Sequence, residues 1–69
     1  MRSILGREFC KLLERRGWTL IRVRGSHHSY EGPNGIGKAV VPVHAGEDLK
    51  KGTLHQLMKD IGWTEEDLK

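Results

Sequence analysis

Apolar residues recur at helical spacing near the start of the chain. The stripe consists of Leu5, Phe9, Leu12 and Leu13, and this spacing is typical of one face of an amphipathic helix. We expect Ser3 to cap this helix and Gly17 to end it. The opposite face carries three basic residues, which we interpret as a solvated outer face: Arg7, Lys11 and Arg15.

The period then changes to two, which predicts a strand over residues 19–24. Gly25-Ser26 follows, and a glycine at the first central position of a two-residue loop indicates a type II′ hairpin turn, because that position needs a positive φ. A second strand is expected over residues 27–31. After a glycine-rich turn, residues 38–44 form a third expected strand, in which Pro42 indicates an edge strand or a strand end.

The expected hairpin determines which residues face each other across its two strands. With Gly25-Ser26 as the loop, the facing pairs are Arg24 and His27, Val23 and His28, Arg22 and Ser29, and Ile21 and Tyr30. Facing residues share one side of the sheet. We therefore expect His28 and Tyr30 on the core side, and His27 and Ser29 beside the arginines on the solvent side.

A second helical stripe follows a polar connection. Its members are Leu54, Leu57, Met58 and Ile61, and Gly62 ends the pattern. Thr64 and Asp67 then predict one last capped turn. The order helix, three-stranded antiparallel meander, helix predicts a two-layer α+β domain of the α-β-β-β-α type over residues 1–69, with both helices on one face of the sheet.

Composition limits the class of protein. The chain has 69 residues, of which 36% are hydrophobic and 30% charged, so it holds one small domain. It contains no apolar run near the ~20 residues of a membrane span and no signal-peptide core, and we expect a cytosolic protein. The lone Cys10 cannot form an internal disulfide and is expected to be a small buried residue. Residues 1–24 hold seven basic and two acidic residues, which indicates a polyanionic partner.

The tandem His27-His28 after the hairpin turn is the most informative group for chemistry, because imidazole exchanges protons near neutral pH. An imidazole beside Arg22 and Arg24 suits RNA cleavage, in which the 2′-hydroxyl loses a proton, the 5′-oxygen gains one and phosphorane charge is neutralised. This route needs no metal or cofactor. Further hydrogen bonds to the phosphoryl oxygens are available from the N–H groups of the turn and from two hydroxyls, those of Ser26 and Ser29.

Two other interpretations of the histidines compete with catalysis. Adjacent histidines in a strand are commonly one packed and one exposed without any chemistry, and on spacing alone this interpretation outweighs catalysis. A metal site is less favoured still, because neighbouring strand residues point to opposite faces and no cysteine or carboxylate recurs at ligand spacing. We expect His55 at the surface, whereas His44, at the end of a strand, can approach either the hairpin or the solvent.

Five segments form a specific pattern through their order and spacing. They are Leu12-Leu13-Glu14 with Gly17-Trp18, Arg22 to His28, Val41 to His44, Leu49 to Leu54, and Met58 to Gly62. Over nearly the whole chain this pattern resembles HicA, the family of small toxins of HicA–HicB toxin–antitoxin pairs. The resemblance implies a double-stranded-RNA-binding-domain-like fold, metal-independent ribonuclease activity on mRNA, and a HicB antitoxin that blocks the active site.

The resemblance also implies roles for individual residues. The family's essential histidine follows its Gly-Ser turn, here Gly25 and Ser26, and we assign that histidine to His27. His28 is the reserve, because a one-residue shift of register exchanges the two. The family's basic strand residue corresponds to Arg24. Charge and expected exposure add four RNA-contacting residues: Arg22, Lys38, Lys50 and Lys51.

We retain one alternative from another functional class. A non-catalytic RNA-binding module of the same fold would use the same basic face through phosphate and 2′-hydroxyl contacts. In both interpretations RNA is a partner, and neither a metal nor a small-molecule cofactor nor a membrane is expected. Only the catalytic interpretation requires His27 to exchange a proton.

Overall fold

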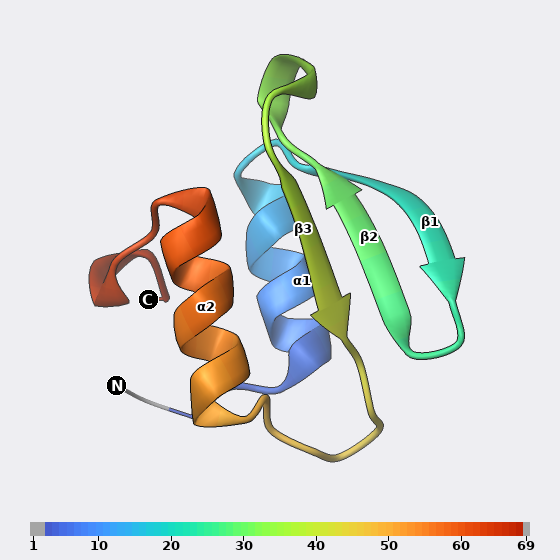
Figure 1. Cartoon of the computed structure of the whole chain (residues 1–69), viewed down its shortest axis with the longest axis vertical. Helices are drawn as coiled ribbons and strands as arrows, with labels where there is room; N and C mark the ends of the chain where they lie inside the picture. The colour runs from blue at the N-terminus through green and yellow to red at the C-terminus, as the bar shows by residue number, and fades with distance from the viewer. Residues whose placement is uncertain (1–2, 69) are drawn as a thin grey trace.

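The computed structural model describes residues 3–68 of the chain. Its elements are α1 (Gly6–Arg15), β1 (Thr19–Arg24), β2 (His27–Glu31), η1 (Pro33–Gly35), β3 (Lys38–Pro42), α2 (Lys51–Ile61) and η2 (Glu65–Leu68). The strands form one antiparallel sheet in the order β1-β2-β3. Helix α1 lies behind this sheet and α2 lies along its β3 side (Figure 1). The predicted α-β-β-β-α order and α+β class are confirmed.

Helix α1 begins later than the sequence predicted. Leu5 is the N-cap, and its backbone N–H donates to the Glu8 carboxylate at 3.0 Å. The prediction of Ser3 as the cap is therefore wrong. The physical reason is Ile4, which is only 1% exposed and whose carbonyl accepts a hydrogen bond at 2.8 Å from the loop before α2. Burial of this side chain holds the entering segment extended up to Leu5, so the helix starts at Gly6.

The β1–β2 hairpin has the predicted register near its tip and departs from it further along. The observed pairs at the tip are Arg24 with His27, Val23 with His28, and Arg22 with Ser29. The register then shifts between Leu20 and Arg22, so that Leu20 faces Tyr30. The predicted pairing of Ile21 with Tyr30 is wrong, because a bulge places an extra residue on β1. The alternation at the tip is unaffected.

Strand β3 ends at Pro42, two residues before the predicted end at His44. It is also an edge strand of the sheet, so Pro42 marks both an edge strand and a strand end, the two positions that the sequence indicated. The next residue, Val43, donates its backbone N–H to the carbonyl of Ser26 at 2.7 Å. This hydrogen bond ties the end of β3 to the tip of the β1–β2 hairpin.

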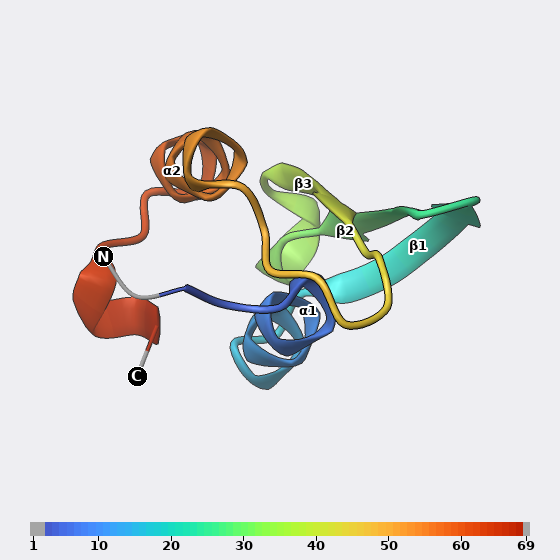
Figure 2. The same cartoon turned by 90° about the horizontal axis from the view of Figure 1, so that it is seen from below.

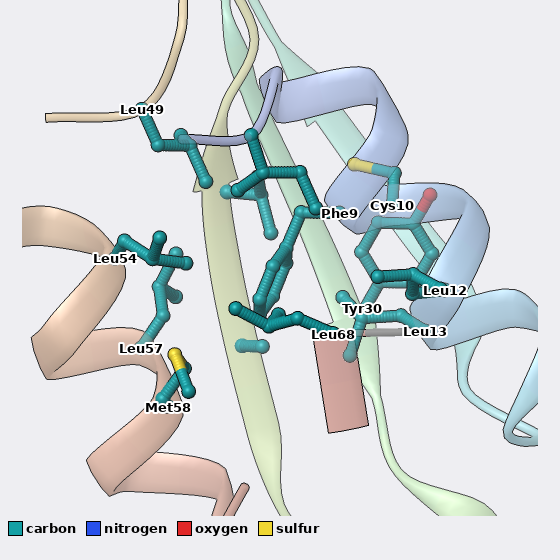
Figure 3. Close-up of a cluster of buried hydrophobic side chains, with 13 residues drawn as sticks. Phe9, Cys10, Leu12, Leu13, Tyr30, Leu49, Leu54, Leu57, Met58 and Leu68 are labelled. Atoms are coloured by element: carbon teal, nitrogen blue, oxygen red, sulfur yellow. The ribbon is translucent and has the colours of Figure 1, made fainter. Parts of the chain in front are cut away.

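The hydrophobic core lies between the sheet and the two helices (Figure 3). Its buried members are Ile4, Phe9, Cys10, Leu12, Leu13, Tyr30, Ala39, Val41, Leu49, Leu54, Leu57, Met58 and Leu68. Tyr30 donates its hydroxyl to the Glu14 carboxylate at 2.6 Å, which links β2 to α1. Burial raises the pKa of the Cys10 thiol, as expected of a small buried cysteine. Trp18 and Trp63 are partly buried and pack against this core.

The last turn joins the C-terminal segment to α1. Gly62 ends α2, as predicted, and has the left-handed conformation. The Asp67 carboxylate accepts the backbone N–H of Thr64 at 2.8 Å and binds the Arg16 guanidinium at 2.9 Å. The hydrogen bond from Thr64 is the main reason that the pKa of Asp67 is lowered, and the hydrogen bond from Arg16 adds to it.

Among residues 3–68, no helix has both the length and the apolar character needed to cross a membrane.

Candidate active site

The open face, defined here as the side of the sheet turned away from α1, carries paired residues in three rows. From β1 through β2 to β3, the rows are Arg24–His27–Pro42, called the tip row below, then Arg22–Ser29–Val40, and then Thr19–Glu31–Lys38. Buried Tyr30, Ala39 and Val41 occupy the opposite side. Figure 2 shows the sheet with α1 on that opposite side, so the open face is accessible to a large ligand.

His27 is the first residue of β2, and its side chain is exposed in the tip row. The adjoining turn has Gly25 at φ +55°, a left-handed conformation that glycine adopts without steric cost. A Cβ at Gly25 would meet no atom within 4 Å, so the backbone conformation, not lack of space, requires glycine. Ser26 has no positive φ, as in a type II′ turn. The turn thus starts β2 with His27 on the open face.

His28 lies on the opposite side of β2. It pairs with Val23 on β1 and with buried Val41 on β3, and its side chain is half-buried. The predicted separation of the two histidines, one on each face, is confirmed. Only His27 lies on the face that the arginines of β1 share.

Arg22 and Arg24 are exposed on the open face of β1. Arg24 is directly opposite His27, a position at which Cβ atoms lie about 5 Å apart, and Arg22 is its diagonal neighbour, at about 7–8 Å. Within residues 3–68, neither arginine forms an ion pair. Both guanidinium groups are therefore available to bind a phosphate beside the imidazole.

The three predicted lysines do not lie together. Lys50 is the N-cap of α2 and lines a pocket of about 210 Å³ that Pro42 of the tip row also lines. Lys51 is exposed at the start of α2. Lys38 pairs with Glu31 in the row furthest from the hairpin tip. The structure thus brings Lys50, but not Lys38, to the edge of the tip row.

Two further histidines are placed by the fold. His44 is exposed and lines the same pocket as Lys50, so it lies beyond β3 on the side where the chain turns towards α2. His55 is exposed on α2, as predicted. Across the described range, residues 3–68, no three His, Cys, Asp or Glu side chains are placed to hold a metal ion.

A second hollow of the open face lies between β3 and α2, and no pattern in the sequence pointed to it. Its volume is about 360 Å³, and it is lined by Val40, Gly52, Thr53, Gln56, Leu57 and Asp60. Thr53 also lines the pocket at Lys50, so the two hollows adjoin. The four-residue spacing of Gln56 and Asp60 is visible in the sequence, but the sequence does not show that these residues lie beside β3.

Most of the chain matches one protein-family model. Residues 6–63 match the model described as HicA toxin of bacterial toxin–antitoxin, a segment that contains every element described above except the last turn. No curated protein matches the chain significantly. The match includes both helices, the three strands, the two adjacent histidines and the arginines of β1. The chain therefore belongs to the HicA toxin family of bacterial toxin–antitoxin systems.

Proposed function

We propose that this chain is a type II toxin that cleaves mRNA as a metal-independent endoribonuclease, with His27 as its general acid and base. Family membership supports the role of toxin. One observation carries the mechanism: an exposed imidazole lies on the open face opposite Arg24, while the neighbouring His28 is turned to the core side. Cleavage of mRNA would stop translation and growth.

The reaction transfers one proton to His27 and one proton away from it. The neutral imidazole accepts the proton of an RNA 2′-hydroxyl while the 2′-oxygen attacks the adjacent phosphorus. The P–O2′ bond forms, the P–O5′ bond breaks, and the imidazolium returns its proton to the departing 5′-oxygen. One end then carries a 2′,3′-cyclic phosphate and the other a 5′-hydroxyl. The atoms balance without a cofactor.

The groups around His27 are suited to stabilising the charge that develops on phosphorus. The guanidinium groups of Arg24 and Arg22 are placed to hold the phosphoryl oxygens, which gain negative charge in the phosphorane. Ser29, in the middle row, presents its hydroxyl on the same face. We assign the turn at Gly25 and Ser26 the role of positioning His27. Lys50 and Lys51 would bind the continuing RNA backbone, with Lys38 as a more distant contact.

The proposed protein partner is a HicB-like antitoxin, which would cover the open face and block His27. A short reading frame beside this gene that encodes such a protein would support the proposal. The purified pair should form a complex in which RNA is no longer cut.

The proposed catalysis is tested with variants of the two adjacent histidines. The parent chain, His27→Ala and His28→Ala are each incubated with a defined RNA in excess EDTA, and the products are separated on a gel. His28→Ala is the matched control, because it removes the same side chain from the other face of the same strand. Circular dichroism verifies the fold of each, and fluorescence anisotropy reports RNA binding.

We expect the parent and His28→Ala to cut the RNA, and His27→Ala to bind RNA without cutting it. Cutting by His27→Ala at the parent's rate would remove His27 from the mechanism, and loss of cutting in His28→Ala alone would transfer the role to His28. If the parent binds RNA but cuts none, the chain is a non-catalytic RNA-binding module.

A further inference from the structure

We propose that the hollow between β3 and α2 binds a guanine base of the RNA and selects where the chain is cut. The inference rests on the proposed function, because it assigns a base-binding subsite next to the proposed nuclease centre. The hollow, called the base pocket below, is lined by Val40, Gly52, Thr53, Gln56, Leu57 and Asp60. None of these residues contributes to the proposed proton transfer.

The distance from the base pocket to His27 is no more than the length of one nucleotide. Its strand residue, Val40, is in the middle row, next to the tip row that holds His27. These two residues are diagonal neighbours on adjacent strands, a position at which residues lie about 7–8 Å apart. A base seated over Val40 would therefore leave its own phosphate within reach of the imidazole. Val40 is half-exposed and gives the base an apolar surface.

The polar edge of the base pocket consists of an amide and a carboxylate that already contact each other. The side-chain N–H of Gln56 donates to one carboxylate oxygen of Asp60 at 2.8 Å. This leaves the second Asp60 oxygen and the Gln56 carbonyl oxygen as acceptors, and one amide N–H as a donor. The exposed edge is therefore rich in acceptors.

Among the four RNA bases, guanine complements this edge best. Its Watson–Crick edge presents two adjacent donors, N1–H and the N2 amino group, followed by the O6 acceptor. Adenine, cytosine and uracil each present only one donor group there. Each carboxylate oxygen can accept two hydrogen bonds, so Asp60 can accept both guanine donors while it keeps its bond from Gln56, and the remaining Gln56 N–H matches O6. Unpaired bases are commonly read by such contacts to this edge.

Two residues of the base pocket are poorly suited to the helix that carries them. Asp60 lies in the last turn of α2, where the helix dipole disfavours a negative charge. Gly52 is the second residue of α2, where glycine is a weak helix former. A Cβ at Gly52 would meet no atom within 4 Å, so packing does not require glycine. Both residues instead suit a pocket that needs an exposed carboxylate and space.

The test measures base preference as the ratio of binding affinities for two probes of equal charge. A change in the net charge of the protein affects both affinities alike and leaves this ratio unchanged. The probes are uridine oligonucleotides of equal length with one central guanosine, inosine or adenosine. Inosine lacks only the N2 amino group, so it removes one of the two guanine donors. Binding is measured by fluorescence anisotropy in the His27→Ala background, and cleavage with His27 intact. The variants are Asp60→Asn and Gly52→Leu, with Glu66→Gln, exposed in the last turn, as the charge-matched control.

We expect the guanosine probe to bind roughly tenfold more tightly than the inosine and adenosine probes, as a good bidentate pair provides. Asp60→Asn should bring this ratio close to one, Gly52→Leu should weaken binding of the guanosine probe, and Glu66→Gln should preserve the ratio. Equal binding of guanosine and inosine, or an unchanged ratio in Asp60→Asn, would overturn the inference.

The two proposals fail in different ways. Cleavage that shows no base preference would leave the nuclease intact and remove the base pocket. Guanosine-selective binding that depends on Asp60, in a chain that cuts no RNA, would retain the base pocket and remove the nuclease.

Discussion

Tyr30 shows how a single buried residue connects the core with the site. It lies three positions after His27 on β2, is 1% exposed, and donates its hydroxyl to Glu14 of α1 at 2.6 Å. The hydrogen bond holds the strand that carries His27 against the helix beneath it. Burial is the main reason that the pKa of Tyr30 is raised, and the bond to Glu14 adds to it.

Replacing Tyr30 by Phe removes this hydroxyl and keeps the ring. Because Glu14 is exposed, water can replace its lost partner, and we expect the free energy of unfolding to decrease by about 1 kcal/mol at pH 7. Urea denaturation followed by circular dichroism measures the change. Glu14→Gln, which keeps an acceptor for the same hydroxyl, should cost less. A loss above about 3 kcal/mol in Tyr30→Phe, the upper end for an unsatisfied buried group, would contradict this account.

The same residue predicts a pH dependence. The pKa of Tyr30 is higher in the folded chain than its ordinary value of about 10 in the unfolded chain. Above pH ~10 the unfolded chain therefore releases a proton that the folded chain retains, so stability is full below this pH and decreases above it. Urea midpoints at pH 7, 9, 10 and 11 should fall less steeply for Tyr30→Phe. Parallel curves for the two proteins would exclude Tyr30 as the source.

Among the elements, the β1–β2 hairpin decides which histidine reaches the open face. Its tip is held by the left-handed Gly25 and by the hydrogen bond from Val43 to Ser26 at 2.7 Å. The alternation of β2 then places His27 on the open face and His28 on the core side. The geometry of the site therefore depends on one turn.

A pair of glycine variants separates positioning from stability. Gly25 and Gly46 both have positive φ, +55° and +73°, and a Cβ at either would meet no atom within 4 Å. Each change to Ala should therefore destabilise the fold by a similar amount, about 1–2 kcal/mol for the left-handed backbone. Only Gly25→Ala should also slow RNA cleavage, by tenfold or more, because it moves His27. Equal cleavage rates for the two variants would show that the turn does not position the histidine.

Across the whole molecule, positive charge lies on the open face near β1 while the acidic last turn lies beside α1. Arg22 and Arg24 occupy the open face, whereas Asp67 binds Arg16 at the end of α1. Under the proposed function, this placement of charge would orient RNA towards the tip row.

This asymmetry predicts a difference between two arginines. Arg24→Ala removes a phosphate contact, so the slope of log binding constant against log salt concentration should decrease by about one unit. Arg7→Ala removes the same charge from the exposed side of α1 and should leave the slope nearly unchanged. Fluorescence anisotropy from 50 to 300 mM salt measures both. A similar loss of slope in the two variants would mean that RNA does not select the open face.

Much of the fold and part of the candidate site follow from local patterns in the sequence. The period of two separates His27 from His28, and a glycine with positive φ is required at the tip, because strand alternation and turn conformation depend only on neighbouring residues. The helix stop at Gly62 and the capped last turn have the same local origin.

Other features depend on contacts between residues far apart in the chain, which only the tertiary structure decided. Burial of Ile4 moved the helix start away from Ser3, and the bulge at Ile21 changed the pairing of β1. Packing of α2 beside β3 created the hollow at Asp60 and brought Lys50 to the tip row. The sequence by itself therefore determined the elements and the face of each histidine, through local backbone geometry. The tertiary structure decided what surrounds them, because long-range packing depends on the whole core.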